Sequence, residues 1–339
     1  ARWMAASSSP GGGAPAARGG LDSGVHHPAG GGPLPLGFRS EPHRDAAPSD
    51  PALVPSAAVK LGLQIPSFTW PGGAEAIGPT LARIVRTADD VGIDSLWVMD
   101  HFFQIRSVGA VEEPMLEGLT TLGWMAAHSS RASLGLLVGG IHYRAPGLWV
   151  KATTTLDVLS RGRAWFGIGA AWNEQESLGL GFGFPPLGER FELLEDTLRF
   201  ALDMWRGERG TETPFEGRRL RATRLLNSPQ ADPRPHPRIL IGGGGERRTL
   251  RLVAEYADAT NVFGGPEAIR HKFEVLRDHC QAIGRPYEAI ERTTLQQIDP
   301  ALPDGSGRQA PAEIVDRFGE LADVGVQHVI VSVPEVWRT

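Results

Sequence analysis

Residues 132–169, ASLGLLVGGIHYRAPGLWVKATTTLDVLSRGRAWFGIG, contain one complete strand, helix and strand unit. The aliphatic runs at 132–138 and 164–169 predict buried strands, and the amphipathic segment 147–160 has the length of a helix. Two strands joined by such a helix are parallel, because the helix carries the chain back to the starting edge of the sheet. This stretch therefore predicts an α/β fold built on a parallel sheet.

The same alternation continues on both sides of this unit. Further strands are predicted at 59–66, 94–99, 238–242, 258–263, 291–297 and 327–333. Further helices are predicted at 76–91, 118–129, 188–206, 246–256, 266–283 and 311–324. Eight strands with helices between them over about 280 residues favour a closed (β/α)8 TIM barrel over an open, doubly wound sheet. The segment PSFTWPGG at 66–73 also lacks the nucleotide-binding fingerprint that follows the first strand of such open sheets.

Two segments depart from this regular pattern. The segment 207–237 is rich in Arg, Pro and Gly and too long for an ordinary connection, so we expect a surface insertion with a short hairpin. Only PEVWRT, residues 334–339, follows the eighth strand, which is too short for a final helix. We therefore expect either a truncated chain or a last strand that no helix covers.

Composition limits the partners and the location of the chain. Residues 1–58 are dominated by Gly, Ala and Pro and should form a disordered leader, in which His26 and His27 hold no metal. The net charge of −5 provides no basic field for nucleic acid or an anionic membrane. The single cysteine, Cys280, and the lack of an apolar run of about 18 residues lead us to expect a cytoplasmic protein without metal site or membrane span.

The active site of such a barrel lies at the carboxyl ends of its strands. The glycines Gly242, Gly243 and Gly244 follow the fifth predicted strand and open a helix, so their backbone N–H groups should cradle the phosphate of a cofactor. Arg247 would add a charge-assisted contact to that phosphate or to an acidic tail. The alternatives are a flexible glycine turn without ligand and a solvated arginine.

Asp100 and His101 follow the second predicted strand. A carboxylate and an imidazole at one strand end can orient a polar ring and move protons near neutral pH, so both are candidate catalytic residues. The alternative is a histidine bonded to neighbouring loops and an aspartate that caps the next turn. His142 is a second candidate acid or a ring contact.

Aromatic side chains gather at the same strand ends. They would form flat apolar walls for a tricyclic ring, although aromatic residues are also common in protein cores. The candidates are Trp70, Phe102, Phe103 and Trp172. Glu117, in the loop after the second strand, is expected to stabilise the N-terminus of a helix.

Four motifs together resemble the bacterial luciferase-like monooxygenase superfamily over residues 59–333. They are GLQIPSFTWPGG at 62–73, LWVMDHF at 96–102, GGIHYRAPGLWVKATTTLDVLSRGRAWFGIGAAWNEQE at 139–176 and ILIGGGGERRTLRLVAEYADATNVF at 239–263. The segments GIGAAWNE and IGGGGERRTL are more similar to the branch of the superfamily that uses the 5-deazaflavin coenzyme F420.

This resemblance implies hydride transfer between coenzyme F420 and a small organic substrate. It implies that Asp100 and His101 lie against the ring, that Asp100 contacts the cofactor and that His101 acts as acid or base. It also implies a homodimer and a non-prolyl cis peptide near Leu136 and Leu137. The open alternatives are an FMN-dependent monooxygenase that uses molecular oxygen, a non-catalytic flavin-binding barrel, and a cofactor-free phosphosugar-type barrel.

Overall fold

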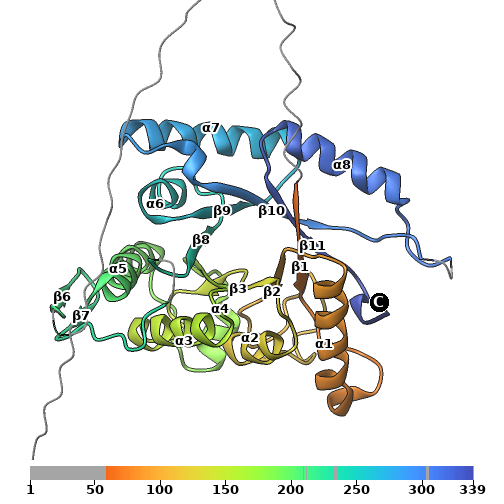
Figure 1. Ribbon diagram of the computed structural model, residues 1–339, viewed down its shortest axis with the longest axis horizontal. Helices are drawn as coiled ribbons and strands as arrows, with labels where there is room; N and C mark the ends of the chain where they lie inside the picture. The colour runs from red at the N-terminus through yellow and green to blue at the C-terminus, as the bar shows by residue number, and fades with distance from the viewer. Residues whose placement is uncertain (1–58, 209, 211, 232–234, 303–304, 339) are drawn as a thin grey trace, which may run out of the picture. The chain divides into compact units, whose positions relative to one another are not determined.

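The computed structural model describes residues 59–208, 210, 212–231, 235–302 and 305–338. The glycine-rich leader, with His26 and His27, lies outside these described residues. The chain from residue 59 forms one parallel sheet that runs β3-β2-β1-β11-β10-β9-β8-β5 and closes where β3 pairs with β5 (Figure 1). The predicted closed barrel is therefore confirmed.

The eight predicted strands are all present. They are β1 Lys60–Ile65, β2 Ser95–Val98, β3 Ser133–Leu136, β5 Ala164–Gly169, β8 Arg238–Gly242, β9 Ala259–Val262, β10 Glu291–Gln297 and β11 His328–Ser332. A two-residue strand, β4 Gly139–Gly140, continues the third position of the barrel and also pairs with β5. The predicted hairpin of the 207–237 insertion is formed by β6 Phe215–Glu216 and β7 Arg221–Ala222.

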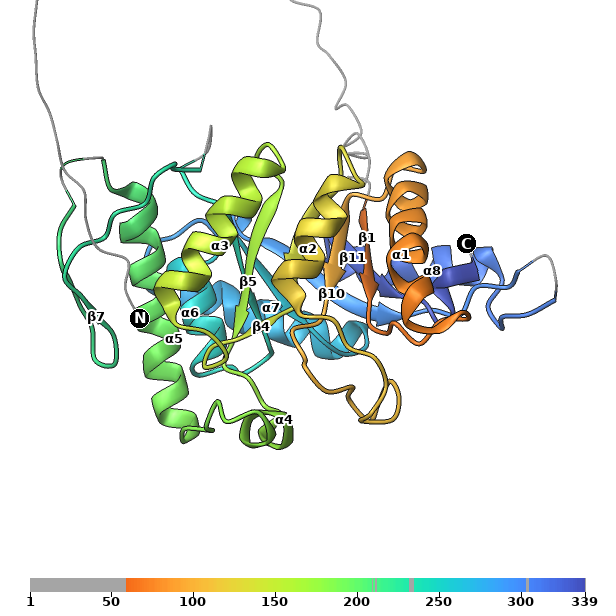
Figure 2. The ribbon, with the colours of Figure 1, turned by 90° about the horizontal axis from the view of Figure 1, so that it is seen from below.

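The predicted helices are also present on the outside of the barrel. They are α1 Gly73–Asp90, α2 Gly118–Ala127, α3 Pro146–Leu159, α5 Leu187–Arg206, α6 Thr249–Tyr256, α7 Pro266–Ala282 and α8 Pro311–Asp323. Helices α1, α2, α3 and α5 lie side by side in chain order (Figure 2). One short helix, α4 Glu174–Gly179, was not predicted. After β11 the chain forms a single 3-10 turn, Val336–Arg338.

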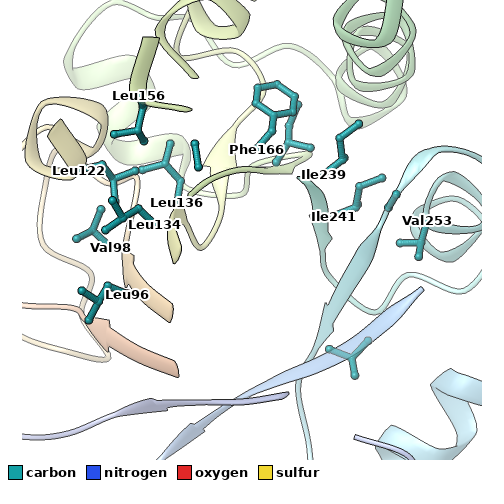
Figure 3. Close-up of a cluster of buried hydrophobic side chains, with 14 of the residues drawn as sticks. Leu96, Val98, Leu122, Leu134, Leu136, Leu156, Phe166, Ile239, Ile241 and Val253 are labelled. Carbon is teal, nitrogen blue, oxygen red and sulfur yellow. The ribbon is translucent and has the colours of Figure 1, made fainter. Parts of the chain in front are cut away.

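Alternating side chains of the strands fill two apolar layers. In β2, Leu96 and Val98 point outward and pack against the helices, whereas Trp97 points into the barrel. Figure 3 shows the outer layer, in which Leu122 of α2 and Leu156 of α3 face such strand residues. The barrel interior is filled by Trp97, Leu137, Trp165, Leu240, Ala259 and Ile330. Strands that are buried on both faces, such as β2 and β5, appear in the sequence as near-continuous apolar runs, whereas β10 has the mostly polar sequence ERTTLQQ.

Left-handed glycines let the chain leave two of the outer helices. Gly92 follows α1 with φ +94°, and Gly325 follows α8 with φ +96°. This conformation costs glycine little and other residues more, so both helices end there and the chain turns into the next strand. The loops at the opposite, carboxyl ends of the strands are free to carry the site. Helix α4 and the loop after β2 project together at that end (Figure 2).

Candidate functional site

A cavity of about 300 Å³ lies at the carboxyl ends of β2, β4, β5, β8 and β9. Its lining includes Asp100 and His101 from the end of β2, Trp172 from the end of β5, and Gly242–Gly245 after β8. The glycine run and the Asp-His pair therefore meet in one cavity, although the sequence separates them by more than a third of the chain. A single ligand in this cavity can reach both groups.

The glycine run presents two free backbone donors to this cavity. The sequence predicted that the amide of Gly243 would bind a ligand. This amide instead donates to the carbonyl of Asn261 at 2.9 Å and is not available. The amides of Gly244 and Gly245 donate to no acceptor among the described residues. They line the cavity together with the buried Thr249, which opens α6. Two free amides of the glycine run therefore face the cavity, and they begin at Gly244, two residues after the predicted Gly242.

Asn261 supplies a polar atom to the cavity floor. Its side-chain amide donates to Thr293 Oγ1 at 2.8 Å, which leaves the oxygen Oδ1 buried without a partner among the described residues. A buried acceptor without a donor is unfavourable by about 1 to 3 kcal/mol. A ligand that brings an N–H or O–H group to Asn261 would remove this cost.

The cavity wall requires glycine at two strand ends. A Cβ at Gly242 or at Gly169 would come within 2.9 Å of the Val138 side chain, closer than carbon atoms can approach. The peptide between Leu137 and Val138 is cis, one residue beyond the predicted position, and both residues line the cavity. Small residues at the ends of β5 and β8 thus keep this part of the cavity open beside Val138.

Asp100 is buried and held by a cation. Both carboxylate oxygens accept from the Arg144 guanidinium, at 2.6 and 2.7 Å, and one also accepts from the amide of Gly140 at 3.0 Å. Burial lowers the pKa of the Arg144 guanidinium. The hydrogen bonds and charges of Asp100, and then of Glu117, outweigh burial, so the pKa of Arg144 is raised overall. With both oxygens engaged in this way, Asp100 ties the loop after β2 to Arg144 and Gly140, and its part in the chemistry stays a prediction.

His101 is anchored by a carboxylate that the sequence analysis did not single out. Nδ1 of His101 lies 2.5 Å from Oε1 of Glu176, which is fully buried at the start of α4. Glu176 also accepts from the hydroxyl of Tyr143 at 2.6 Å and from the amide of Phe102 at 2.7 Å. Burial works against its ionisation, yet the bonds from His101, Tyr143 and Phe102 outweigh burial and lower its pKa.

An ionised Glu176 can only accept hydrogen bonds, so Nδ1 of His101 carries its proton toward the carboxylate. The other ring nitrogen, Nε2, is then the atom that can exchange a proton with a ligand. His101 lines the cavity, and its ring meets the exposed Trp172 edge-on at a centroid distance of 5.4 Å. The arrangement therefore presents one imidazole nitrogen beside a flat aromatic surface.

The other aromatic candidates divide between the core and the loops. Trp70 is buried against Phe68. Phe102 packs on Tyr143 and Phe182 and does not line this cavity. Of the four predicted walls, Trp172 lines this cavity and Phe103 does not. Trp70, together with Trp172, lines a second and larger cavity.

Two predicted cofactor contacts lie outside the cavity lining. His142 contacts Ser177 Oγ at 2.9 Å through Nε2 and packs on Tyr143, and burial, followed by the nearby Arg190, lowers its pKa. Its position points to support of α4. Arg247 is exposed on the turn before α6 and does not reach the cavity. Glu117 accepts from the amides of Leu119 and Thr120, as expected for a residue that caps a helix.

A second and larger cavity, of about 910 Å³, adjoins the first. The two share four lining residues, His101, Leu137, Trp172 and Phe263. The larger cavity lies over the carboxyl ends of β1, β2, β10 and β11. The site thus has room for two neighbouring ligands, with His101 between them.

Comparison with known proteins identifies the relatives of this chain. The family model described as "luciferase-like monooxygenase" matches residues 60–298. The F420-dependent glucose-6-phosphate dehydrogenase of Kineococcus radiotolerans is 31% identical over 230 residues, which cover 66% of this chain. The chain spans 65% of the length of this relative and of a second dehydrogenase of the same name from Nakamurella multipartita.

Solved structures share the fold at low identity. An F420-dependent secondary alcohol dehydrogenase, in complex with an F420-acetone adduct, has a TM-score of 0.68 and 13% identity. The match covers 82% of this chain and 94% of that one. The monooxygenase RslO1 from Streptomyces bottropensis also has a TM-score of 0.68, with 17% identity over 83% of this chain and 96% of that one. At such identities the likeness supports the barrel fold.

Proposed function

The chain belongs to the luciferase-like monooxygenase family, and from this premise we propose that it is an oxidoreductase that transfers hydride between coenzyme F420 and a small organic substrate. The names of its curated relatives, F420-dependent dehydrogenases about 30% identical to it, support this choice within the family. The observation that carries the proposal is the shared cavity, in which free amides of the glycine run lie opposite an imidazole held by a buried carboxylate.

The residues of the first cavity fit a phosphorylated, ring-bearing cofactor. Gly244 and Gly245 offer two unpaired N–H donors to a phosphate, and Thr249 adds a hydroxyl beside them. The unpaired Oδ1 of Asn261 would accept from a polar ring edge or a side-chain hydroxyl of the cofactor. The exposed face of Trp172 can cover an aromatic ring.

The protein's own groups would position the reactants and carry the proton. A bound 5-deazaflavin supplies the carbon that gives or takes the hydride. Glu176 holds His101 in the tautomer that presents Nε2, and this nitrogen gives or takes the substrate hydroxyl proton. Asp100, paired with Arg144, would contact the cofactor.

A binding experiment tests the choice of cofactor. The purified protein is incubated with coenzyme F420 or with FMN, passed over a desalting column, and examined by its absorbance spectrum. We expect F420 to be retained and FMN to be lost. Retention of FMN alone would support the alternative, an FMN-dependent monooxygenase. Retention of neither cofactor would contradict both proposals.

The proposal also includes a homodimer in the cytoplasm. Family resemblance supports the dimer, and the single cysteine of the chain is consistent with a reducing compartment. Among the described residues, no helix combines the length and the apolar character that crossing a membrane requires. Size-exclusion chromatography with light scattering tests the dimer directly.

A further inference from the structure

The second cavity offers mainly apolar surface to a substrate. Its walls include Pro66, Trp70, Val108, Leu295, Val333 and Trp337. Hydroxyl and amide side chains, such as Ser67 and Gln297, make up most of its polar lining. Among the described residues that line it there is no lysine and no arginine. The wall therefore has no fixed positive charge for an anionic substrate.

Two carboxylates lie at this cavity. Glu335 belongs to its lining and pairs with Arg338 at 3.1 Å. Thr69, another lining residue, donates its hydroxyl to the Glu113 carboxylate at 2.7 Å, which places a second negative charge behind the wall. Bonds to Thr69 and then to the amide of Ala110 keep the pKa of Glu113 below its usual range, so this carboxylate is ionised near neutral pH.

Two arginines packed behind the walls already donate hydrogen bonds. Arg317 of α8 donates to the carbonyl of Gln297 at 3.4 Å and to the side chain of Gln296. Arg83 of α1 donates to the carbonyl of Trp337. Arg106, between the lining residues Ile105 and Ser107, is exposed and is not part of the wall. Partial desolvation of a dianion beside a wall without a cation is unfavourable.

One buried amide can recognise a hydroxyl group at the inner end of the cavity. Gln64 of β1 is buried, and its Nε2 donates to the carbonyl of Leu137 at 3.3 Å. Its Oε1 receives no bond from a described residue and remains an acceptor for a substrate O–H. His101 lines the same cavity. Gln64 and His101 thus offer an alcohol group two polar contacts within a largely apolar pocket.

We propose that the second cavity takes an uncharged, largely apolar alcohol or carbonyl compound and rejects phosphorylated substrates. Only the hydride-transfer step of this inference rests on the proposed function. In the oxidising direction, the alcohol loses a hydride from its carbinol carbon to the coenzyme and its hydroxyl proton to Nε2 of His101. The C–H and O–H bonds break, the C=O bond forms, and the coenzyme is reduced as the alcohol is oxidised.

Binding and turnover are measured separately to test this proposal. Thermal unfolding of the coenzyme-free and coenzyme-loaded protein is followed with cyclohexanone or with glucose 6-phosphate. We expect cyclohexanone to raise the melting temperature and glucose 6-phosphate to leave it unchanged. With F420 bound, kcat/KM for cyclohexanol should exceed that for glucose 6-phosphate by about 100-fold. Stabilisation by glucose 6-phosphate, or no stabilisation by cyclohexanone, would overturn the proposal.

A charge introduced into the wall provides a gain-of-function test. Val108 lines the cavity and is 40% exposed, so Val108→Lys adds a cation at the wall at little cost to folding. We expect it to raise kcat/KM for glucose 6-phosphate about tenfold. Val315→Lys, on the 66% exposed Val315 of α8, is the matched control and should leave this value unchanged. An equal effect of both variants would contradict a role of the wall.

Failure of the proposed function can be told apart from failure of this inference. If the protein does not bind F420, the assignment of the coenzyme is wrong, but the binding preference of the coenzyme-free protein still decides the chemistry of the second cavity. If F420 binds and glucose 6-phosphate is the better substrate, the coenzyme assignment stands and the inference about the cavity is wrong.

Discussion

Glu176 and His101 are 75 positions apart in the chain, yet Oε1 of Glu176 lies 2.5 Å from Nδ1 of His101. The carboxylate is fully buried and also binds the hydroxyl of Tyr143, so it cannot move without breaking several bonds. A rigid acceptor on one side of an imidazole fixes which nitrogen carries the proton. Glu176 is therefore a positioning residue that acts through His101.

Removal of the charge at position 176 tests this relationship. In Glu176→Gln, the amide can donate to Nδ1 and favour the wrong tautomer, so we expect kcat to fall by about 100-fold with little change in KM. The acid limb of the pH-rate profile should also move to lower pH, because the imidazolium loses a neighbouring negative charge. Glu174→Gln, at an exposed position of the same helix, should leave both unchanged. A normal pH profile in Glu176→Gln would reject the positioning role.

Replacement of the imidazole should affect turnover more than binding. We expect His101→Ala to reduce kcat by about 100-fold or more while the Kd for F420 stays within about twofold. Steady-state kinetics and fluorescence titration of the coenzyme measure the two effects. His128→Ala is a suitable control, because His128 lies at the end of α2 and contacts Arg86. Unchanged turnover in His101→Ala would remove this residue from the chemistry.

The glycine after β8 should matter for the coenzyme and little for the reaction step. Gly243 has φ +114°, a conformation that strains any other residue by about 1 to 3 kcal/mol. Gly243→Ala should therefore shift the turn that aims the amides of Gly244 and Gly245, and raise the Kd for F420 about tenfold. Gly265→Ala, at φ −81° with open space around it, is the control. Equal affinities of the two variants would mean that the turn does not hold the cofactor.

Asp89 should make the stability of the barrel depend on pH. Burial works against its charge, but bonds from Ala132, Ser130 and Arg131 outweigh burial and lower its pKa from 3.8 to about 2. The stabilisation is complete above the ordinary pKa and is lost as the pH falls toward 2. Near neutral pH it amounts to about 2 kcal/mol.

The matching substitution is Asp89→Asn. Urea unfolding near neutral pH should show a loss of about 2 kcal/mol against the wild type, and the difference should shrink below about pH 3. Asp90→Asn, at the exposed neighbouring position, should have little effect at either pH. A difference between Asp89→Asn and the wild type that stays constant down to low pH would show that shape, and not charge, is what the site requires.

The sequence predicted the barrel because most of its strands, such as β2 and β5, are short apolar runs whose side chains are buried on both faces. Helix ends were also visible, since Gly92 and Gly325 mark the reversals. Helix α4 was missed because its six residues are too few to show a periodic pattern. The run WNEQE at 172–176 did place carboxylates after the β5 strand, and this was the signal that could have led to Glu176.

The site itself was predictable as a set of strand ends but not as a set of contacts. Asp100, His101, Trp172 and the glycine run all line one cavity, which follows from the topology of the barrel. The pairing of Asp100 with Arg144 and the use of the Gly243 amide by Asn261 depend on side-chain and backbone directions across different strands. Local sequence carries no information on such long-range partners, so those assignments required coordinates.

The packed interior of the barrel limits the routes by which reactants can enter and leave the site. Trp97, Trp165 and Leu240 fill the lumen beneath the strand ends, so the described part of the chain offers no passage through the barrel to its opposite end. Coenzyme and substrate must then enter and leave at the carboxyl ends of the strands, where the two cavities adjoin. A substrate molecule bound in the second cavity should therefore slow the release of the coenzyme from the first cavity. The expected kinetic result is dead-end inhibition at high substrate concentration.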